Sequence, residues 1–146
     1  MRIDNDKLNE MFKIVRVDKD LLYSSLIKMG KKQLKSKEMR DGWSEDNPTY
    51  CYCYVVAEML FWYVCPADSK PYKVKVPNDP GIHRFIKLSS GEIIDLTAEQ
   101  FSNYEDVNYD NGKVSYFLQT ANKGPSKRAI MLAELMGYTT LTREIK

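Results

Sequence analysis

Two segments near the start of the chain carry apolar residues three and four positions apart, which is the spacing of one helical face. These residues are Leu8, Met11, Phe12 and Val15 in the first segment, and Leu21, Leu22, Leu26 and Met29 in the second. The pattern predicts amphipathic helices over residues 7–15 and 21–29. Asp18 or Asp20 is suited to cap the start of the second helix, and Gly30 is suited to end it.

Residues 53–64 are apolar around almost the whole circumference of a helix, with Glu58 as the exception. Valine and aromatic residues also favour strands, but a run of twelve residues is more typical of a helix. We therefore expect a helix buried in the centre of the protein, ended by Cys65 and Pro66.

Beyond this helix the hydrophobic period changes from 3.6 to 2. Residues 72–76 alternate between apolar and polar side chains, and so do residues 83–88. Ser89, Ser90 and Gly91 then form a turn signal that leads into residues 92–96. The pattern predicts two antiparallel strands joined by a tight turn, with a third strand earlier in the chain.

A last helix is delimited by residues 124–126 (Gly-Pro-Ser) at its start and by Gly137 at its end. The elements together predict an α+β fold, in which the buried helix packs on a small antiparallel sheet and is flanked by N- and C-terminal helices. A length of 146 residues suits one domain. We divide it into a helical extension (1–42), a core (43–129) and a C-terminal helix and tail (130–146).

The overall charge gives no reason to expect nucleic acid or a membrane as a partner, because 22 Lys and Arg face 20 Asp and Glu. One stretch departs from this balance. Residues 28–40 hold six basic side chains against Glu38 alone. Such a run is more often a solvated helical face than an anion-binding patch, and we expect the solvated face here.

A cytoplasmic location is expected from two features. The N-terminus alternates charged and apolar residues and lacks the apolar core of an export signal. Cys51, Cys53 and Cys65 form an odd number, which argues against a disulfide framework and for reduced thiols. The longest apolar stretch, residues 50–64, is shorter than the roughly 20 residues that cross a bilayer.

Three residues could form a catalytic group. Cys53 opens the buried helix, His83 is the only histidine and begins a strand, and Asp95 ends the partner strand. A helix N-terminus and an imidazolium both stabilise a thiolate, and a third group must orient the imidazole. If the turn centres on Ser90, residue 83 lies opposite Thr97, with Asp95 diagonal to it. Taken singly, each of these residues is more often structural.

A resemblance to a known family adds to this reasoning. Residues 47–58 (NPTYCYCYVVAE) and 83–101 (HRFIKLSSGEIIDLTAEQF) resemble a family of small bacterial and phage proteins called YunG-like. The family pattern is an Asn-Pro loop, a Cys that opens a helix, a His that leads a strand, and an Asp-x-Thr-x-x-Gln-Phe ending. Residues 124–129 (GPSKRA) also look like a family feature.

The strand, turn and strand between His83 and Asp95 are similar to the core of papain-like and transglutaminase-like cysteine enzymes. The resemblance implies Cys53 as nucleophile and a cytoplasmic protein of a bacterium or, if phage-encoded, of the host cell. Two positions depart from the family pattern: Cys51 stands where we expect Gly, and Arg84 where we expect an aromatic residue. Cys51 then implies a strained turn or a second thiol at the site.

The leading hypothesis is a hydrolase or acyltransferase without a cofactor, acting on a protein or on a small amide or thioester. Cys53 attacks a carbonyl, His83 moves the proton and Asp95 orients His83. The Cys53 N–H, with Asn47 or Tyr50, would bind the oxyanion.

Two alternatives are a non-catalytic module that binds or inhibits a host factor, and a zinc site. The zinc ligands would be Cys51, Cys53, Cys65 and His83. A zinc site is disfavoured because Cys53 and Cys65 flank a helix of about 18 Å.

Overall fold

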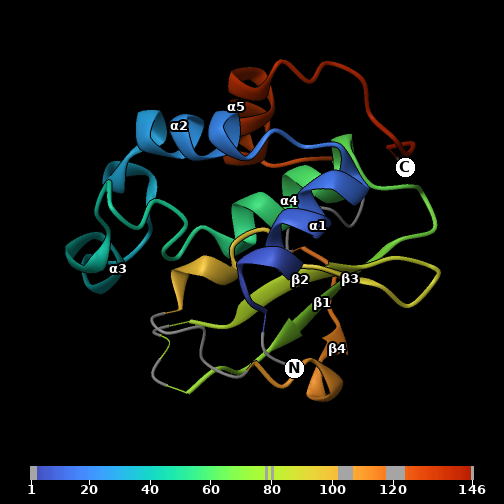
Figure 1. Cartoon of the computed structure of the whole chain (residues 1–146). Helices are drawn as coiled ribbons and strands as arrows, with labels where there is room; N and C mark the ends of the chain where they lie inside the picture. Colours follow the sequence, from blue (N-terminus) through green and yellow to red (C-terminus); the bar gives the residue numbers. More distant parts are fainter. Residues whose placement is uncertain (1–2, 78, 80, 102–106, 118–123, 146) are drawn as a thin grey trace.

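The computed structural model describes residues 3–77, 79, 81–101, 107–117 and 124–145 (Figure 1). These residues form five α-helices and a four-stranded antiparallel sheet, which confirms the predicted α+β class. The helices are α1 (Asn5–Val15), α2 (Lys19–Met29), α3 (Lys37–Gly42), α4 (Cys53–Tyr63) and α5 (Lys127–Met136). The strands are β1 (Lys70–Val74), β2 (His83–Lys87), β3 (Ile93–Ile94) and β4 (Lys113–Val114), in the spatial order β3-β2-β1-β4.

Side-chain caps fix where the predicted helices begin. Asp18 accepts a hydrogen bond from the Leu21 N–H at 3.1 Å, so Asp18 rather than Asp20 caps α2. Ser126 caps α5 in the same way, and Gly137 ends that helix with a left-handed φ of 81°. The predicted α1, α2 and α5 are therefore confirmed. No described helix is long and apolar enough to cross a membrane.

Helix α4 lies at the centre of the described structure. All but two of its side chains are buried, including Glu58. The sheet covers one side of α4 through β2 and β1, and α5 covers another side, with α2 packed on α5 (Figure 1). The core around α4 takes residues from the predicted N-terminal extension, such as Leu8 and Leu22, and from α5, such as Leu132.

The sheet register matches the predicted hairpin. Ile86 pairs with Ile94, and Lys87 pairs with Ile93, so the β2–β3 turn centres on Ser90. Strand β1 lies two residues earlier than predicted because the chain turns at Val76, whose carbonyl accepts the Asp79 N–H at 3.1 Å. The Tyr- and Asn-rich sequence of residues 103–113 predicts a loop, of which residues 103–106 lie outside the described part.

The basic stretch 28–40 is not the single helical face that its charge pattern predicted. Gly30 ends α2 with a φ of 68°, a conformation that glycine adopts without strain. A 3₁₀ turn (Lys31–Gln33) follows, and α3 begins only after its cap, Ser36. Lys35 therefore lies in the irregular link before α3, and its ammonium is 5.9 Å from the centroid of the Tyr54 ring in the first turn of α4.

Buried Glu58 ties α4 to the start of α5. Its carboxylate accepts hydrogen bonds from the backbone N–H and the hydroxyl of Ser126, both at 2.7 Å. Burial raises the pKa of Glu58, while the two bonds from Ser126 and the charges of Arg128 and Lys35 oppose that rise. The hydroxyl of Ser126 also caps α5, so one contact both satisfies a buried carboxyl group and fixes a helix start.

Replacing Glu58 should therefore destabilise the protein. Glu58→Ala removes both acceptors of Ser126, and we expect the free energy of unfolding to fall by about 2–4 kcal/mol in urea titrations. Glu134→Ala, at an exposed position on α5, is the control and should change it by less than about 0.5 kcal/mol. Equal effects of the two substitutions would contradict this role of Glu58.

Candidate functional site

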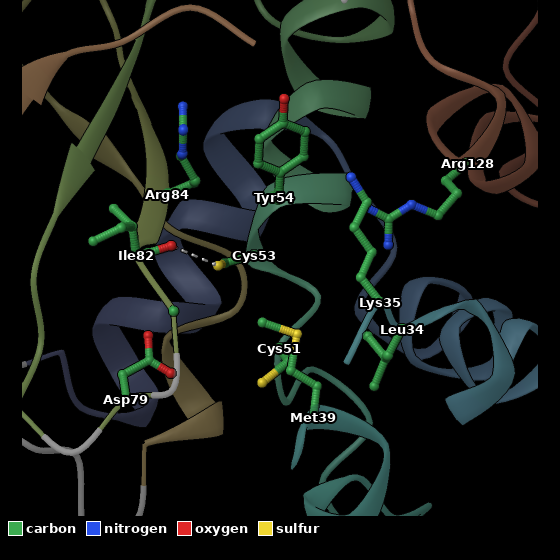
Figure 2. A pocket seen from close by; sticks show the side chains of 11 residues that line it. Leu34, Lys35, Met39, Cys51, Cys53, Tyr54, Asp79, Ile82, Arg84 and Arg128 are labelled. Carbon is green, nitrogen blue, oxygen red and sulfur yellow. Dashed lines mark hydrogen bonds between the residues drawn. The ribbon is translucent and has the colours of Figure 1, made fainter. Parts of the chain in front are cut away.

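Cys53 is the first residue of α4 and lies beside the start of β2. Its thiol donates a hydrogen bond to the carbonyl oxygen of Ile82, with 3.7 Å between Sγ and O (Figure 2). The side chain is buried, and the residue is 7% exposed. Because α4 begins here, the backbone N–H groups of its first turn point out of the helix toward the surroundings of Cys53.

His83 and Asp95 form a buried pair. The Nε2 atom of His83 lies 2.5 Å from Oδ2 of Asp95, and the two residues are 0% and 1% exposed. The same Oδ2 accepts the hydroxyl of Tyr109 at 2.5 Å, and Oδ1 accepts the Thr97 N–H and hydroxyl at 3.3 Å. Asp95 thus acts only as an acceptor, so Nε2 of His83 carries the proton that it shares with Asp95.

The His83 side chain also contacts Cys53, and its second ring nitrogen is Nδ1. This Nδ1 atom is buried and has no hydrogen-bond partner in the described part of the chain. Burial lowers the pKa of His83, but the charge and hydrogen bond of Asp95, together with the contact with Cys53, outweigh burial and raise the pKa. The imidazole is held by Asp95 at one nitrogen, and its ring contacts the Cys53 side chain.

The Asp-x-Thr-x-x-Gln-Phe segment surrounds this pair. Asp95 closes a local turn onto Thr97, which ends β3 after two residues. The Gln100 amide group donates to the carbonyl and hydroxyl oxygens of Thr97 at 3.0 and 3.1 Å. The Phe101 ring packs edge-on against the His83 ring at a centroid distance of 4.8 Å. Each named residue of the motif therefore contacts another member of the site.

Cys51 adopts a left-handed backbone conformation with a φ of 59°, as expected if it replaces a glycine. Its N–H donates to Oε1 of Gln100 at 3.1 Å, which links the turn before α4 to the segment after β3. Burial raises the pKa of the Cys51 thiol to about 12, and Asp79 adds to the rise. Cys51 therefore stays protonated at neutral pH.

Asn47 and Tyr50 have other partners than an oxyanion at Cys53. The Asn47 amide donates to the carbonyl oxygen of Gln100 at 3.2 Å and so holds two loops together. The Tyr50 ring lies against Gly42, where a Cβ atom would come within 2.6 Å of it. Neither side chain lines the cavity beside Cys53. Of the oxyanion donors expected from the sequence, the Cys53 N–H therefore remains the candidate.

Sequence reasoning missed two residues of the site. Tyr109 hydrogen-bonds to Asp95 from a loop rich in Tyr and Asn, and nothing in that sequence distinguishes it from Tyr116, which is exposed. Gln100 was visible as part of the family motif, and its spacing of three from Thr97 was the available signal.

The described residues give the zinc alternative no supporting geometry. Among the described residues, no group of three His, Cys, Asp or Glu side chains could hold a metal ion. Cys65 follows α4 at the end opposite to Cys53, and burial raises the pKa of its thiol to about 12.

A cavity of about 180 Å³ opens beside Cys53 (Figure 2). Its apolar lining includes Leu34, Met39 and Ile82, and Cys51 also reaches it. The cavity gives a small molecule or side chain access to the buried Sγ atom. A cavity lined by a cysteine that contacts a histidine with a raised pKa is typical of a functional site.

Comparison with protein-family models, with curated proteins and with solved structures gives no significant match to this chain. The resemblance to YunG-like proteins therefore stays a prediction from the motifs.

The single histidine allows a direct test of the His83–Asp95 pair. The imidazole proton signals in NMR belong to His83 alone, and we expect them to titrate above the usual pKa of about 6.5. Asp95→Asn should lower that pKa, because burial then acts with less opposition.

The pKa of His83 is higher in the folded protein than in the unfolded chain. Protonation of His83 therefore stabilises the fold fully below pH 6.5, and this stabilisation is lost at higher pH.

The same pair predicts a pH dependence of stability. Between pH 6.5 and 8.5 the free energy of unfolding of the native protein should fall by up to about 1.4 kcal/mol per pH unit. The fall should be smaller in Asp95→Asn. Identical slopes in the two proteins would show that the pair does not hold the proton.

The strained turn at Cys51 gives a separate prediction. Glycine adopts a φ near 59° without the steric cost that a Cβ atom brings. Cys51→Gly should therefore be more stable than Cys51→Ala by about 1 kcal/mol in thermal or urea unfolding. If the alanine variant were the more stable one, the left-handed conformation would be excluded.

Proposed function

We propose that the protein is a cysteine hydrolase or acyltransferase with Cys53 as nucleophile, His83 as base and acid, and Asp95 as the group that orients His83. One observation carries the proposal. Asp95 binds the Nε2 atom of His83, the His83 side chain also contacts Cys53, and the buried Nδ1 atom has no hydrogen-bond partner among the described residues. In free enzymes, hydrogen bonds between catalytic groups are often long or poorly aligned, and they tighten only when substrate binds.

The reaction would proceed in two stages. The Cys53 sulfur, whose proton has passed to His83, attacks the carbonyl carbon of an amide or thioester and forms a C–S bond. The C–N or C–S bond of the substrate then breaks, and His83 gives the proton to the leaving amine or thiol. Water, deprotonated by His83, attacks the resulting thioester and releases a carboxylic acid and the free thiol.

The acceptor decides the outcome of the second stage. Water as acceptor gives hydrolysis or deamidation, and an amine gives acyl transfer. The N–H of Cys53 at the start of α4 is available to bind the oxyanion that forms in both stages.

The fold and the reduced state of the cysteines support the same proposal. A helix that starts with the nucleophile and packs on an antiparallel sheet bearing the histidine is the arrangement of a papain-like or transglutaminase-like core, which we propose here. The substrate would be a protein or a small amide or thioester. The first step also needs a reduced thiol; all three cysteines are unpaired, as is usual in a cytoplasm.

Alkylation at pH 6 tests the proposal. A free thiol with a pKa near 8.5 is under about 1% ionised at this pH. We expect iodoacetamide to alkylate Cys53 at least roughly tenfold faster than N-acetylcysteine. Cys51 is an internal comparison and should stay unlabelled, because its pKa is raised to about 12. Fragment mass spectrometry assigns the label.

Matched variants make this test specific. Asp95→Asn should slow the labelling of Cys53 by roughly tenfold. Asp110→Asn makes the same change at an exposed position and should leave the rate unchanged. Reaction with p-nitrophenyl acetate should leave an acetyl group on Cys53 and none in Cys53→Ala. A rate equal to that of the free thiol, with no acetyl adduct, would favour the non-catalytic binding module.

A further inference from the structure

The cavity beside Cys53 is lined by three cationic side chains that are distant in sequence. Lys35 comes from the link before α3, Arg84 from β2 and Arg128 from the first turn of α5. Figure 2 draws Arg84 on one side of Tyr54, with Lys35 and Arg128 on the other. Because three separate elements bring them together, a run of charge along one surface helix does not explain the cluster.

Tyr54 is the platform that joins two of these cations. The Arg84 guanidinium lies 4.9 Å from the centroid of the Tyr54 ring, and the Lys35 ammonium lies 5.9 Å from it. One nitrogen of Arg84 donates to the carbonyl and hydroxyl oxygens of Ser115 at 3.1 and 3.2 Å. Arg84 is thus fixed by a single nitrogen, and a guanidinium has further N–H donors for a ligand.

Arg128 is held in the same manner, by a bond from one nitrogen to the Gln33 carbonyl at 2.9 Å. Arg128 and Lys35 also act on Glu58, but that carboxylate is occupied by Ser126. No ion pair joins Lys35, Arg84 or Arg128 to a carboxylate within the described part of the chain. Among the described residues, the three charges therefore have no ion-paired counter-charge.

The single acidic residue of the lining, Asp79, lies near Cys51, whose pKa its charge raises. In Figure 2 Asp79 and Arg84 are on opposite sides of Cys53. The cavity is therefore polarised, with positive charge around Tyr54 and negative charge near Cys51. An anion that enters is drawn to the Tyr54 side.

Two of the residues on the positive side are neighbours of the proposed catalytic residues in the sequence. Tyr54 follows Cys53, and Arg84 follows His83. A group bound beside Tyr54 and Arg84 is therefore kept close to the thiol and the imidazole. The cavity of about 180 Å³ is below the roughly 300–1,000 Å³ that enclose drug-sized ligands, so this group is small.

We infer that the substrate is a small amide or thioester that carries a carboxylate beside the reacting carbonyl, bound by Lys35, Arg84 and Arg128. The reaction in this inference rests on the proposed function, and the carboxylate of the substrate is inferred from the cations that line the cavity. It also gives Arg84, a departure from the family pattern, a role in choosing the substrate. Lys35 then belongs to an anion-binding site rather than to a solvated face.

Two alkylating agents that differ mainly in charge test the inference. Iodoacetate and iodoacetamide are similar in size and share one leaving group, but only iodoacetate is anionic at pH 7. The measured quantity is the ratio of their rates at Cys53, divided by the same ratio for N-acetylcysteine. We expect a value above one in the native protein that falls as NaCl is added, because salt screens the attraction.

Substitutions identify the cations that raise the normalised ratio. Arg84→Gln and Lys35→Gln should each lower the normalised ratio by roughly two- to fivefold, since each removes one cation beside the thiol. Lys87→Gln, on β2 outside the cavity lining, is the matched control and should leave the ratio unchanged. Lys35 is exposed, so its variant keeps the test valid even if Arg84→Gln folds poorly.

The outcomes separate the two proposals. A normalised ratio of one or less in the native protein, or an equal fall in Lys87→Gln, would overturn the anion site. A high ratio together with iodoacetamide labelling no faster than a free thiol would support the anion site and overturn the proposed nucleophile.

Discussion

The burial of α4 is the constraint on which the rest of the structure depends. A helix that is apolar around nearly its whole circumference must be covered on every side, because exposed apolar surface costs free energy in water. The sheet and α5 provide that cover. Once β2 packs along α4, the start of the helix and the start of the strand lie side by side, so Cys53 and His83 meet as a consequence of core packing.

Burying the polar residues of the site among these apolar side chains costs free energy. A buried histidine and aspartate lose hydration, and such a pair seldom stabilises a fold more than well-packed apolar residues would. Here the cost is offset by donors from Tyr109 and Thr97, with the Phe101 ring against the imidazole. A strained cysteine at residue 51 adds a second local cost. Costs of this kind are common where a site is retained for its chemistry.

Periodicity and turn residues were enough to predict much of this arrangement. The apolar run predicted α4, and the Ser-Ser-Gly turn predicted the β2–β3 register, which together bring Cys53, His83 and Asp95 into one region. These features are local, so a single sequence reveals them.

Features that depend on loop paths could not be predicted from the sequence. Tyr109 reaches Asp95 from a loop without periodicity, and the Asn47 amide meets a carbonyl 53 residues away. Gly30 ends α2, and Lys35 lines the cavity from the link that follows, although the basic run looks like one continuous surface. In each case the partner is set by tertiary packing rather than by neighbouring residues.

The position of Arg128 in the last helix has a consequence for synthesis on the ribosome. Cys53, His83 and Asp95 leave the exit tunnel well before α5, and the elements that carry them can pair while the C-terminal part is still being translated. Only when α5 docks does the Glu58 carboxylate gain its hydrogen bonds from Ser126, and only then does Arg128 complete the cavity lining. A nascent chain would therefore assemble the proposed catalytic residues before the proposed anion site.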